Sequence, residues 1–142
     1  MNGTGQTDRV NGRGNLILGY DIARDDNTAF CSGGRFTGKE PCERSGQTWA
    51  VSHKTGSHYL VIGDRNNYAQ YGGLVGGTYN TRIGPSASVS GGVFNTARGP
   101  ATSVSGGREN KASGLYGSVS GGSQRSATGP HDWVAGGLIQ DQ

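Results

Sequence analysis

The sequence of 142 residues has few of the apolar side chains that fill a globular core. Apolar residues make up 31% of the chain, aromatic residues 8%, and there is one methionine. No apolar run approaches the roughly 20 residues that cross a bilayer, and residues 1–5 lack a signal-peptide core. This shortage argues against a compact globular core and against direct membrane contact by this segment. A surface protein would carry both signals elsewhere, so we expect a fragment of a longer chain.

Cysteine is equally scarce, since the chain contains Cys31 and Cys42 and no other. A disulfide between them would close a loop of about twelve residues, worth roughly 3 kcal/mol in the chain-entropy view. Such a bond indicates an oxidising compartment, and two free thiols are the alternative. The pair does not complete a four-ligand metal site. Because His53, His58 and His131 stand beside no recognisable nucleophile motif, we predict no catalytic residue, no metal, no cofactor and a non-enzymatic function.

Glycine, in contrast, is abundant, and much of it belongs to an internal repeat. The motif Ser-Val-Ser-Gly-Gly occupies residues 88–92, 103–107 and 118–122, so its period is fifteen residues. Residues 73–77 and 133–137 lie on the same spacing and end in the same Gly-Gly pair. A fixed period over five units is typical of repeat architectures, in which each unit buries its apolar face against its neighbours.

A second motif, Asn-Thr-Ala-Arg-Gly at residues 95–99, is echoed at 110–114 and, without its asparagine, at 125–129. Each unit therefore predicts two short strands and two glycine turns, and stacked units would pair in parallel about 4.8 Å apart. Corner glycines would supply positive φ or close approach, and the asparagines would stack as a ladder. A flexible Gly/Ser linker is the alternative, but the strict phase argues against it. The predicted structural positions are Val89, Gly91, Gly92, Asn95, Gly99, Val104, Gly106, Gly107, Asn110, Gly114, Val119, Gly121, Gly122 and Gly129.

Residues 87–99 resemble the head repeat of YadA-type trimeric autotransporter adhesins, with Gly91 where that family has a bulky apolar residue. The resemblance covers residues 56–137 well and the N-terminal third loosely. It implies an all-β, left-handed parallel β-roll with 15-residue coils that assembles as a homotrimer. It also implies a secreted or cell-surface protein that mediates adhesion to a host, matrix or glycan surface. A narrow roll with one valine in each coil would gain stability from such self-association.

The net charge of +3 does not indicate a nucleic-acid partner, because placement matters more than number. A nucleic acid requires a continuous basic stripe, whereas the basic residues of the repeat fall at different phases and would scatter around the roll. These residues are Arg82, Arg98, Arg108, Lys111 and Arg125.

The chain divides into a flexible tail at residues 1–13 and a β-roll head domain at 14–142. The strand-like stretch at residues 14–19 parallels residues 56–63, and both are rich in Leu, Ile and Val, as expected for strands that cap the base of the stack. Between them, residues 21–55 form an irregular insertion closed by the cysteines, which we predict to be a partial coil followed by a protruding loop.

Inserted loops in repeat proteins often carry the binding function. The candidate binding surface is Arg35, Lys39, Trp49, Tyr68 and Tyr71. The alternatives are that the loop shields the end of the stack, and that the aromatic residues pack the loop onto the roll. An adhesin head is the leading interpretation. A trimeric phage or contractile-particle tail-fibre segment that recognises a host surface is the second, and the flanking sequence would separate the two.

Overall fold

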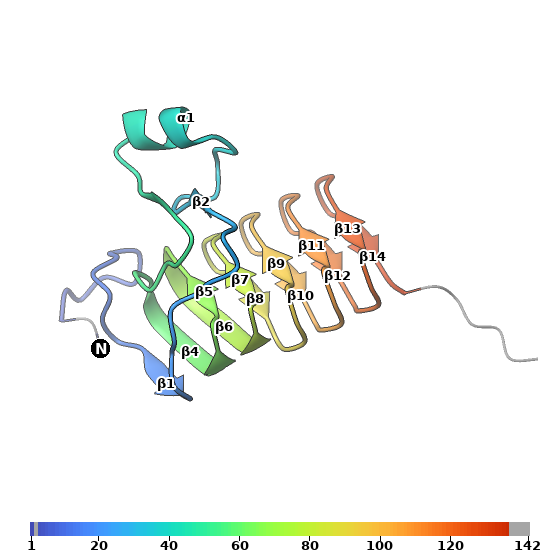
Figure 1. Ribbon diagram of the computed structural model, residues 1–142, viewed down its shortest axis with the longest axis horizontal. Helices are drawn as coiled ribbons and strands as arrows, with labels where there is room; N and C mark the ends of the chain where they lie inside the picture. Colours follow the sequence, from blue (N-terminus) through green and yellow to red (C-terminus); the bar gives the residue numbers. More distant parts are fainter. Residues whose placement is uncertain (2, 137–142) are drawn as a thin grey trace, which may run out of the picture.

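Met1 and residues 3–136 are described by the computed structural model, and they form a β-solenoid with one short helix beside it (Figure 1). The seven-stranded parallel sheet contains, in spatial order, β1 (Leu16–Leu18), β4 (Ser57–Asp64), β6 (Tyr71–Thr78), β8 (Ser88–Val89), β10 (Ser103–Val104), β12 (Ser118–Val119) and β14 (Trp133–Val134). The five-stranded parallel sheet contains β5 (Asn67–Tyr68), β7 (Thr81–Arg82), β9 (Thr96–Ala97), β11 (Lys111–Ala112) and β13 (Ser126–Ala127).

The all-β parallel solenoid with coils of about fifteen residues, predicted from the sequence, is thus confirmed. Its left hand and its trimeric state remain predictions. Gly137 and the remainder of the last predicted unit, residues 137–142, lie outside the described residues.

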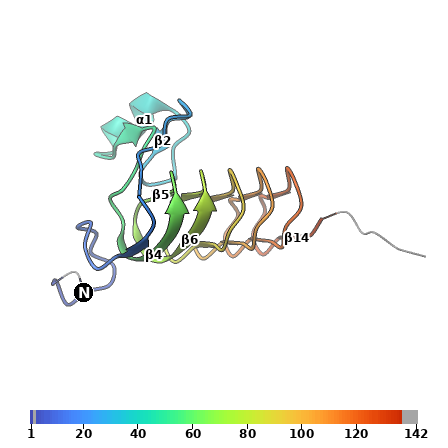
Figure 2. The same cartoon turned by 60° about the horizontal axis from the view of Figure 1, so that its bottom comes forward.

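Small apolar side chains fill the space between the two sheets, whose stacked coils are visible in Figure 2. From β8 to β13 the strands of each coil contribute one valine and one alanine, as Val89 and Ala97 do, and these side chains are completely buried. Nearer the base, Tyr59 and Tyr68 make the core wider. Burial of one valine is worth about 2 kcal/mol, so each regular coil adds little stability. The narrow core is nevertheless closed within a single chain.

The repeat spacing is not uniform along the stack. Ser88 pairs with Ser103, fifteen positions later, but Leu74 pairs with Ser88, fourteen positions later. The predicted alignment of residues 73–77 with 88–92 is therefore wrong by one position in the strand. Val75 pairs with Val89 and Thr78 pairs with Val93, so these pairs mark the same two positions in neighbouring coils. Two residues separate Val75 from Thr78 and three separate Val89 from Val93, so the longer coils contain one additional residue before the corner.

Glycine is required at only some of the repeat positions. Gly107 has a φ of +84°, and a Cβ there would lie 2.1 Å from the carbonyl oxygen of Gly122 in the next coil. Gly106 differs, because a Cβ added to it would meet no described atom within 4 Å. The corner itself is turned by a residue that is not glycine, as at Phe94 and Glu109, with φ near +58° and +56°. Each corner consequently presents a variable side chain to the outside.

Asparagine side chains form a ladder along the inside of this corner. The Asn95 Nδ2 group donates to the carbonyl oxygens of Gly91 (3.0 Å) and Gly107 (2.9 Å), and its Oδ1 accepts from the Asn110 backbone N–H at 2.9 Å. Asn110 Oδ1 in turn accepts from the backbone N–H of Arg125. The ladder therefore satisfies buried backbone groups from one coil to the next.

The insertion interrupts the first coil of the stack. Strand β1 pairs with β4 in the predicted parallel register, Leu16 with Leu60 and Leu18 with Ile62, which confirms its place at the base. The part of that coil that joins the five-stranded sheet comes only at Lys54, which forms a parallel β-bridge with Tyr68 of β5.

Between these two points lie β2 (Phe30–Cys31), α1 (Lys39–Arg44) and β3 (Trp49–Ala50). We call residues 29–50 the arm, and its helix α1 stands away from the stacked coils (Figure 1). Because β2 and β3 pair in antiparallel fashion, Phe30 with Ala50, residues 29–34 are not the partial coil that the Gly-Gly spacing predicted.

An arginine occupies one inward position of the five-stranded sheet. Arg82 lies in register with Ala97 and is completely buried. The prediction that Arg82 is one of the basic residues scattered around the surface of the roll is therefore wrong. Its guanidinium donates to the carbonyl oxygens of Ala87 (3.0 Å) and Ala69 (3.0 Å), and further bonds reach the carbonyls of residues 71 and 72. Burial lowers the pKa of Arg82 to about 9, and the carbonyl acceptors favour the charged form.

Candidate functional site

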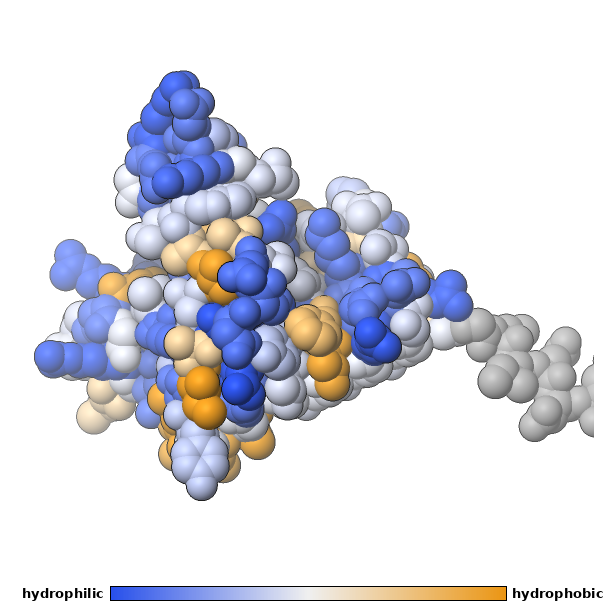
Figure 3. Space-filling view, viewed as in Figure 1, coloured by the Kyte–Doolittle hydropathy of each residue, from blue (hydrophilic) through white to orange (hydrophobic). Residues whose placement is uncertain are grey.

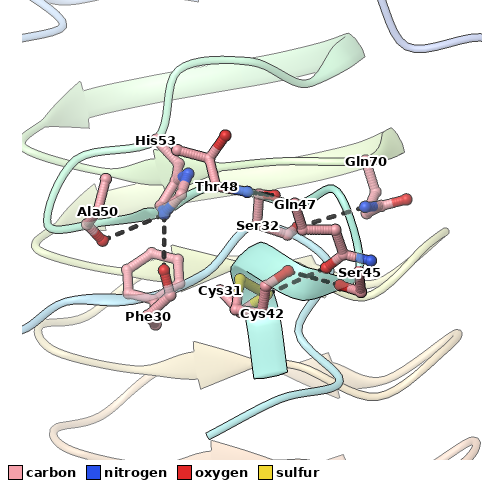
Figure 4. The surroundings of a disulfide bond; sticks show 10 residues. All are labelled: Phe30, Cys31, Ser32, Cys42, Ser45, Gln47, Thr48, Ala50, His53 and Gln70. Carbon is pink, nitrogen blue, oxygen red and sulfur yellow. Dashed lines mark hydrogen bonds between the residues drawn. A yellow bond between two sulfur atoms is a disulfide. The ribbon is translucent and has the colours of Figure 1, made fainter. Parts of the chain in front are cut away.

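The arm is anchored to the outer face of the five-stranded sheet. Phe30 packs in a buried cluster with Ala69 and Ile83, which belong to the first coils. Beneath the arm, His53 Nε2 lies 3.0 Å from the carbonyl oxygen of Phe30 and 3.1 Å from that of Ala50, so this nitrogen is the donor (Figure 4). The arm is thus held by both apolar packing and hydrogen bonds.

The two cysteines join the parts of the arm to each other. The sulfur atoms of Cys31 in β2 and Cys42 in α1 are 2.02 Å apart, and both residues are fully buried (Figure 4). The disulfide predicted from the sequence therefore links the helix to the strand pair that contacts the roll. It leaves no free thiol in the part of the chain that the structure describes.

The charged residues of α1 largely pair with one another. Lys39 Nζ lies 4.0 Å from Glu43 Oε1, and Arg44 Nη2 lies 3.4 Å from Glu40 Oε2, both with the i, i+4 spacing of helix-surface pairs. These pairs are exposed, so each is worth only a few tenths of a kcal/mol. Four of the five charged residues of the arm are thus paired within α1, and Arg35 is the exception.

The five candidate binding residues do not share one surface. Tyr68 is 2% exposed, so its assignment to the binding surface is wrong. Its hydroxyl donates to Asp21 Oδ2 at 2.8 Å, and burial, with this carboxylate, raises the pKa of Tyr68. Trp49 and Tyr71 are half-buried, and Lys39 is exposed on α1.

A loop that precedes the arm covers the aromatic side chains of the first corner. The guanidinium carbon of Arg24 lies 5.6 Å and 5.7 Å from the ring centroids of Tyr79 and Phe94, which stack at 4.8 Å. Arg24 also pairs with Asp26 at 2.6 Å. Desolvation opposes ionisation of Asp26, but the hydrogen bond and charge of Arg24 lower its pKa overall. These aromatic residues pack the loop onto the roll, which was the alternative to a contact role.

A groove of about 440 Å³ lies between the arm and the outer face of the five-stranded sheet. The arm approaches the sheet closely at Gly34, where a Cβ would lie 3.2 Å from Ile83 Cγ2 and 3.3 Å from Arg98 Cγ. Arg98 and Ser113 continue the outward column of Ile83, one residue in each coil. The groove is lined by Gly33, Gly34, Arg35, Pro85, Arg98, Gly99, Pro100 and Ser113.

The groove carries positive charge that the described residues do not neutralise. Arg35 is exposed and Arg98 is half-buried, and within residues 3–136 neither forms an ion pair. Arg98 Nε is buried and has no hydrogen-bond partner there, and burial lowers the pKa of Arg98. Sequence reasoning included Arg35 but treated Arg98 as a scattered surface residue. Only the fold of the arm brings the two to one groove.

The outer face of the seven-stranded sheet is apolar near the base. Leu16, Leu18 and Ile62 are 59%, 53% and 41% exposed, and apolar side chains gather along the lower edge of Figure 3. Strand β1 lies at the base of the stack as predicted, but these two leucines do not fill the core, because they point outward. In later coils this face carries serine, as at Ser88 and Ser103.

No protein-family model matches this chain, and searches of curated proteins and of solved structures also found no match. Among the residues that the structure describes, no group of three or more His, Cys, Asp or Glu side chains could hold a metal ion. The same part of the chain contains no helix with the length and hydropathy to cross a membrane.

Proposed function

We propose that this chain is a non-enzymatic attachment module, the head of a surface-displayed adhesin, and that it binds its target at the groove between arm and roll. The observation that carries the proposal is the pair of unneutralised arginines, Arg35 on the anchored arm and Arg98 on the repetitive scaffold. Natural binding sites are usually concave, with a few polar groups that fix the ligand. The repeat supplies the scaffold, and the single arm makes the groove different from the rest of the roll.

We also propose that the chain is a homotrimer, as the resemblance of its repeat implies. Support comes from the apolar patch of Leu16, Leu18 and Ile62 on the outer face of the seven-stranded sheet. The core of each regular coil is closed within one chain, so this patch is a better reason for association than a thin core. Contiguous exposed apolar surface of this kind marks interaction sites.

Light scattering at micromolar concentration tests the assembly. The unaltered chain is expected to have the mass of a trimer, and Leu18→Asp should lower the mass to that of a monomer. Lys111→Asp, on the other sheet, is the matched control and should keep the trimer. A folded monomer of the unaltered chain would contradict the proposed assembly.

Attachment is tested by applying the chain to arrays of glycans and matrix proteins. Binding is expected, and replacement of Arg35 and Arg98 by glutamine should reduce it at least tenfold while the circular dichroism stays unchanged. Arg108→Gln, an exposed change at the other corner, is the control. Undiminished binding by the double variant would overturn the groove as the binding site. No binding by the unaltered chain to any arrayed surface would overturn attachment as the function.

A further inference from the structure

Arginines enter the groove from two separate parts of the fold. Arg35 belongs to the arm and Arg98 to the repeat, and none of the residues that line the groove is acidic. A guanidinium has a planar set of donors that matches the two oxygens of a carboxylate. We infer that the groove binds the carboxylate of an acidic sugar, with Arg98 and Arg35 as its partners. This inference rests on the proposed function and names the class of ligand.

The walls of the groove favour a sugar over an extended peptide. The backbone N–H groups of Ile83 and Arg98 already donate to carbonyl oxygens of the next coil. Their acceptors are those of Ala97, at 3.0 Å, and Ala112, at 2.8 Å. A peptide therefore cannot pair with the roll through these two N–H groups. The rings of Pro85 and Pro100 offer apolar surface to the C–H face of a pyranose.

The size and charge of the groove fit a small ligand. A volume of about 440 Å³ lies within the range of small-molecule sites and accommodates one or two sugar rings. A nucleic acid would need a longer run of cations than two arginines. The Ser113 hydroxyl lines the groove and supplies a hydrogen-bonding group for a sugar hydroxyl.

Arg98 is prepared for an anion before any ligand arrives. Its Nε is buried without an acceptor, and the arm at Gly34 packs against its side chain, so the guanidinium has already lost part of its water. A bound carboxylate would supply the missing counter-charge, and the cost of ordering the side chain has been met by folding. Arg98 is therefore expected to contribute more to affinity than the exposed Arg35.

Titration of the ¹⁵N-labelled chain with small acids, followed by nuclear magnetic resonance, tests the inference. The probes are the methyl glycosides of N-acetylneuraminic acid and of glucuronic acid, together with their methyl esters, acetate, and a capped Asp-Glu dipeptide. At least one acidic sugar should saturate shifts of the Gly34 and Gly99 amides with a millimolar Kd. Its ester, acetate and the dipeptide should bind at least tenfold more weakly.

Variants locate the binding at the two arginines. Arg98→Gln should weaken the acidic sugar at least tenfold, Arg98→Lys less, and Arg108→Gln not at all, with the remaining spectrum unchanged as the check on folding. Equal affinity for an acid and its ester, for acetate or for the dipeptide would overturn the inference, as would unchanged binding by Arg98→Gln. Array binding that survives loss of both arginines would sink the groove as the binding site and leave adhesion standing. Sugar binding at the groove without attachment to any array would support the groove as a binding site and overturn adhesion as the function.

Discussion

The regular coils after residue 88 and the base of the stack solve the same problem of burial with different side chains. In the regular coils the inward positions of the five-stranded sheet hold alanine, and the core is narrow. At the base the same column holds Tyr68 and Arg82, and Tyr59 lies beside them. The repeat therefore makes a uniform roll, whereas large and polar residues lie inside it where the arm is attached.

Energetically, the two regions depend on different interactions. A regular coil depends on close backbone approach, which glycine permits, and on the asparagine ladder. The base depends on hydrogen bonds from one long side chain, because the guanidinium of Arg82 reaches several backbone carbonyls. Substitutions should therefore act by distinct mechanisms in the two regions.

The largest expected effect is at the base. Arg82→Ala should cost about 4 kcal/mol of unfolding free energy, because it leaves buried carbonyls without donors and opens a cavity. Arg98→Ala is the matched control and should change stability by less than about 1 kcal/mol, since that guanidinium has no protein partner among the described residues. Urea unfolding followed by circular dichroism measures both. Equal losses would show that the base has no special dependence on Arg82.

In the regular coils, Gly107→Ala should cost about 3 kcal/mol, because the new Cβ meets the carbonyl of Gly122 and φ is positive. Gly106→Ala changes the adjacent residue, where a Cβ has open space, and should stay within about 0.5 kcal/mol. The same unfolding experiment compares them. If both variants lose stability equally, the coil register described above is wrong.

Loss of the disulfide should lower the local stability of the arm and leave the roll unchanged. Replacement of Cys31 and Cys42 by serine removes a cross-link worth about 3 kcal/mol to the arm's local stability. Hydrogen exchange should therefore quicken at β2 and β3, whereas β10 and β12 keep their protection. Faster exchange throughout the chain would show that the arm and the roll unfold together.

The smallest effect is expected at the tip of the arm. Lys39→Gln combined with Glu43→Gln removes an exposed ion pair and should change the unfolding free energy by less than about 0.5 kcal/mol. Because the groove lies at the other end of the arm, array binding should also be unaffected. A loss of binding in this variant would move the contact surface from the groove to α1.

The sequence predicted those features that depend on local spacing. The parallel stack and the pairing of β1 with β4 could be predicted because similar stretches of sequence recur and align with one another. The disulfide could be predicted because the chain has only two cysteines. The fourteen-residue coils escaped prediction, because the Gly-Gly pairs remain in phase at the corner while the strands shift by one. The candidate site could be predicted only in part, since Arg35 was included and Arg98 was not.

The repeat spacing was enough to predict a parallel solenoid, because a fixed period leaves few other ways to bury one valine in each unit. The burial of a tyrosine and an arginine inside the solenoid could be seen only in the folded chain. Tyr68 and Arg82 look like surface residues in the sequence, but hydrogen bonds to Asp21 and to backbone carbonyls offset the cost of burying them. Those partners are supplied by segments that only folding brings together, and the groove between Arg35 and Arg98 arises in the same way.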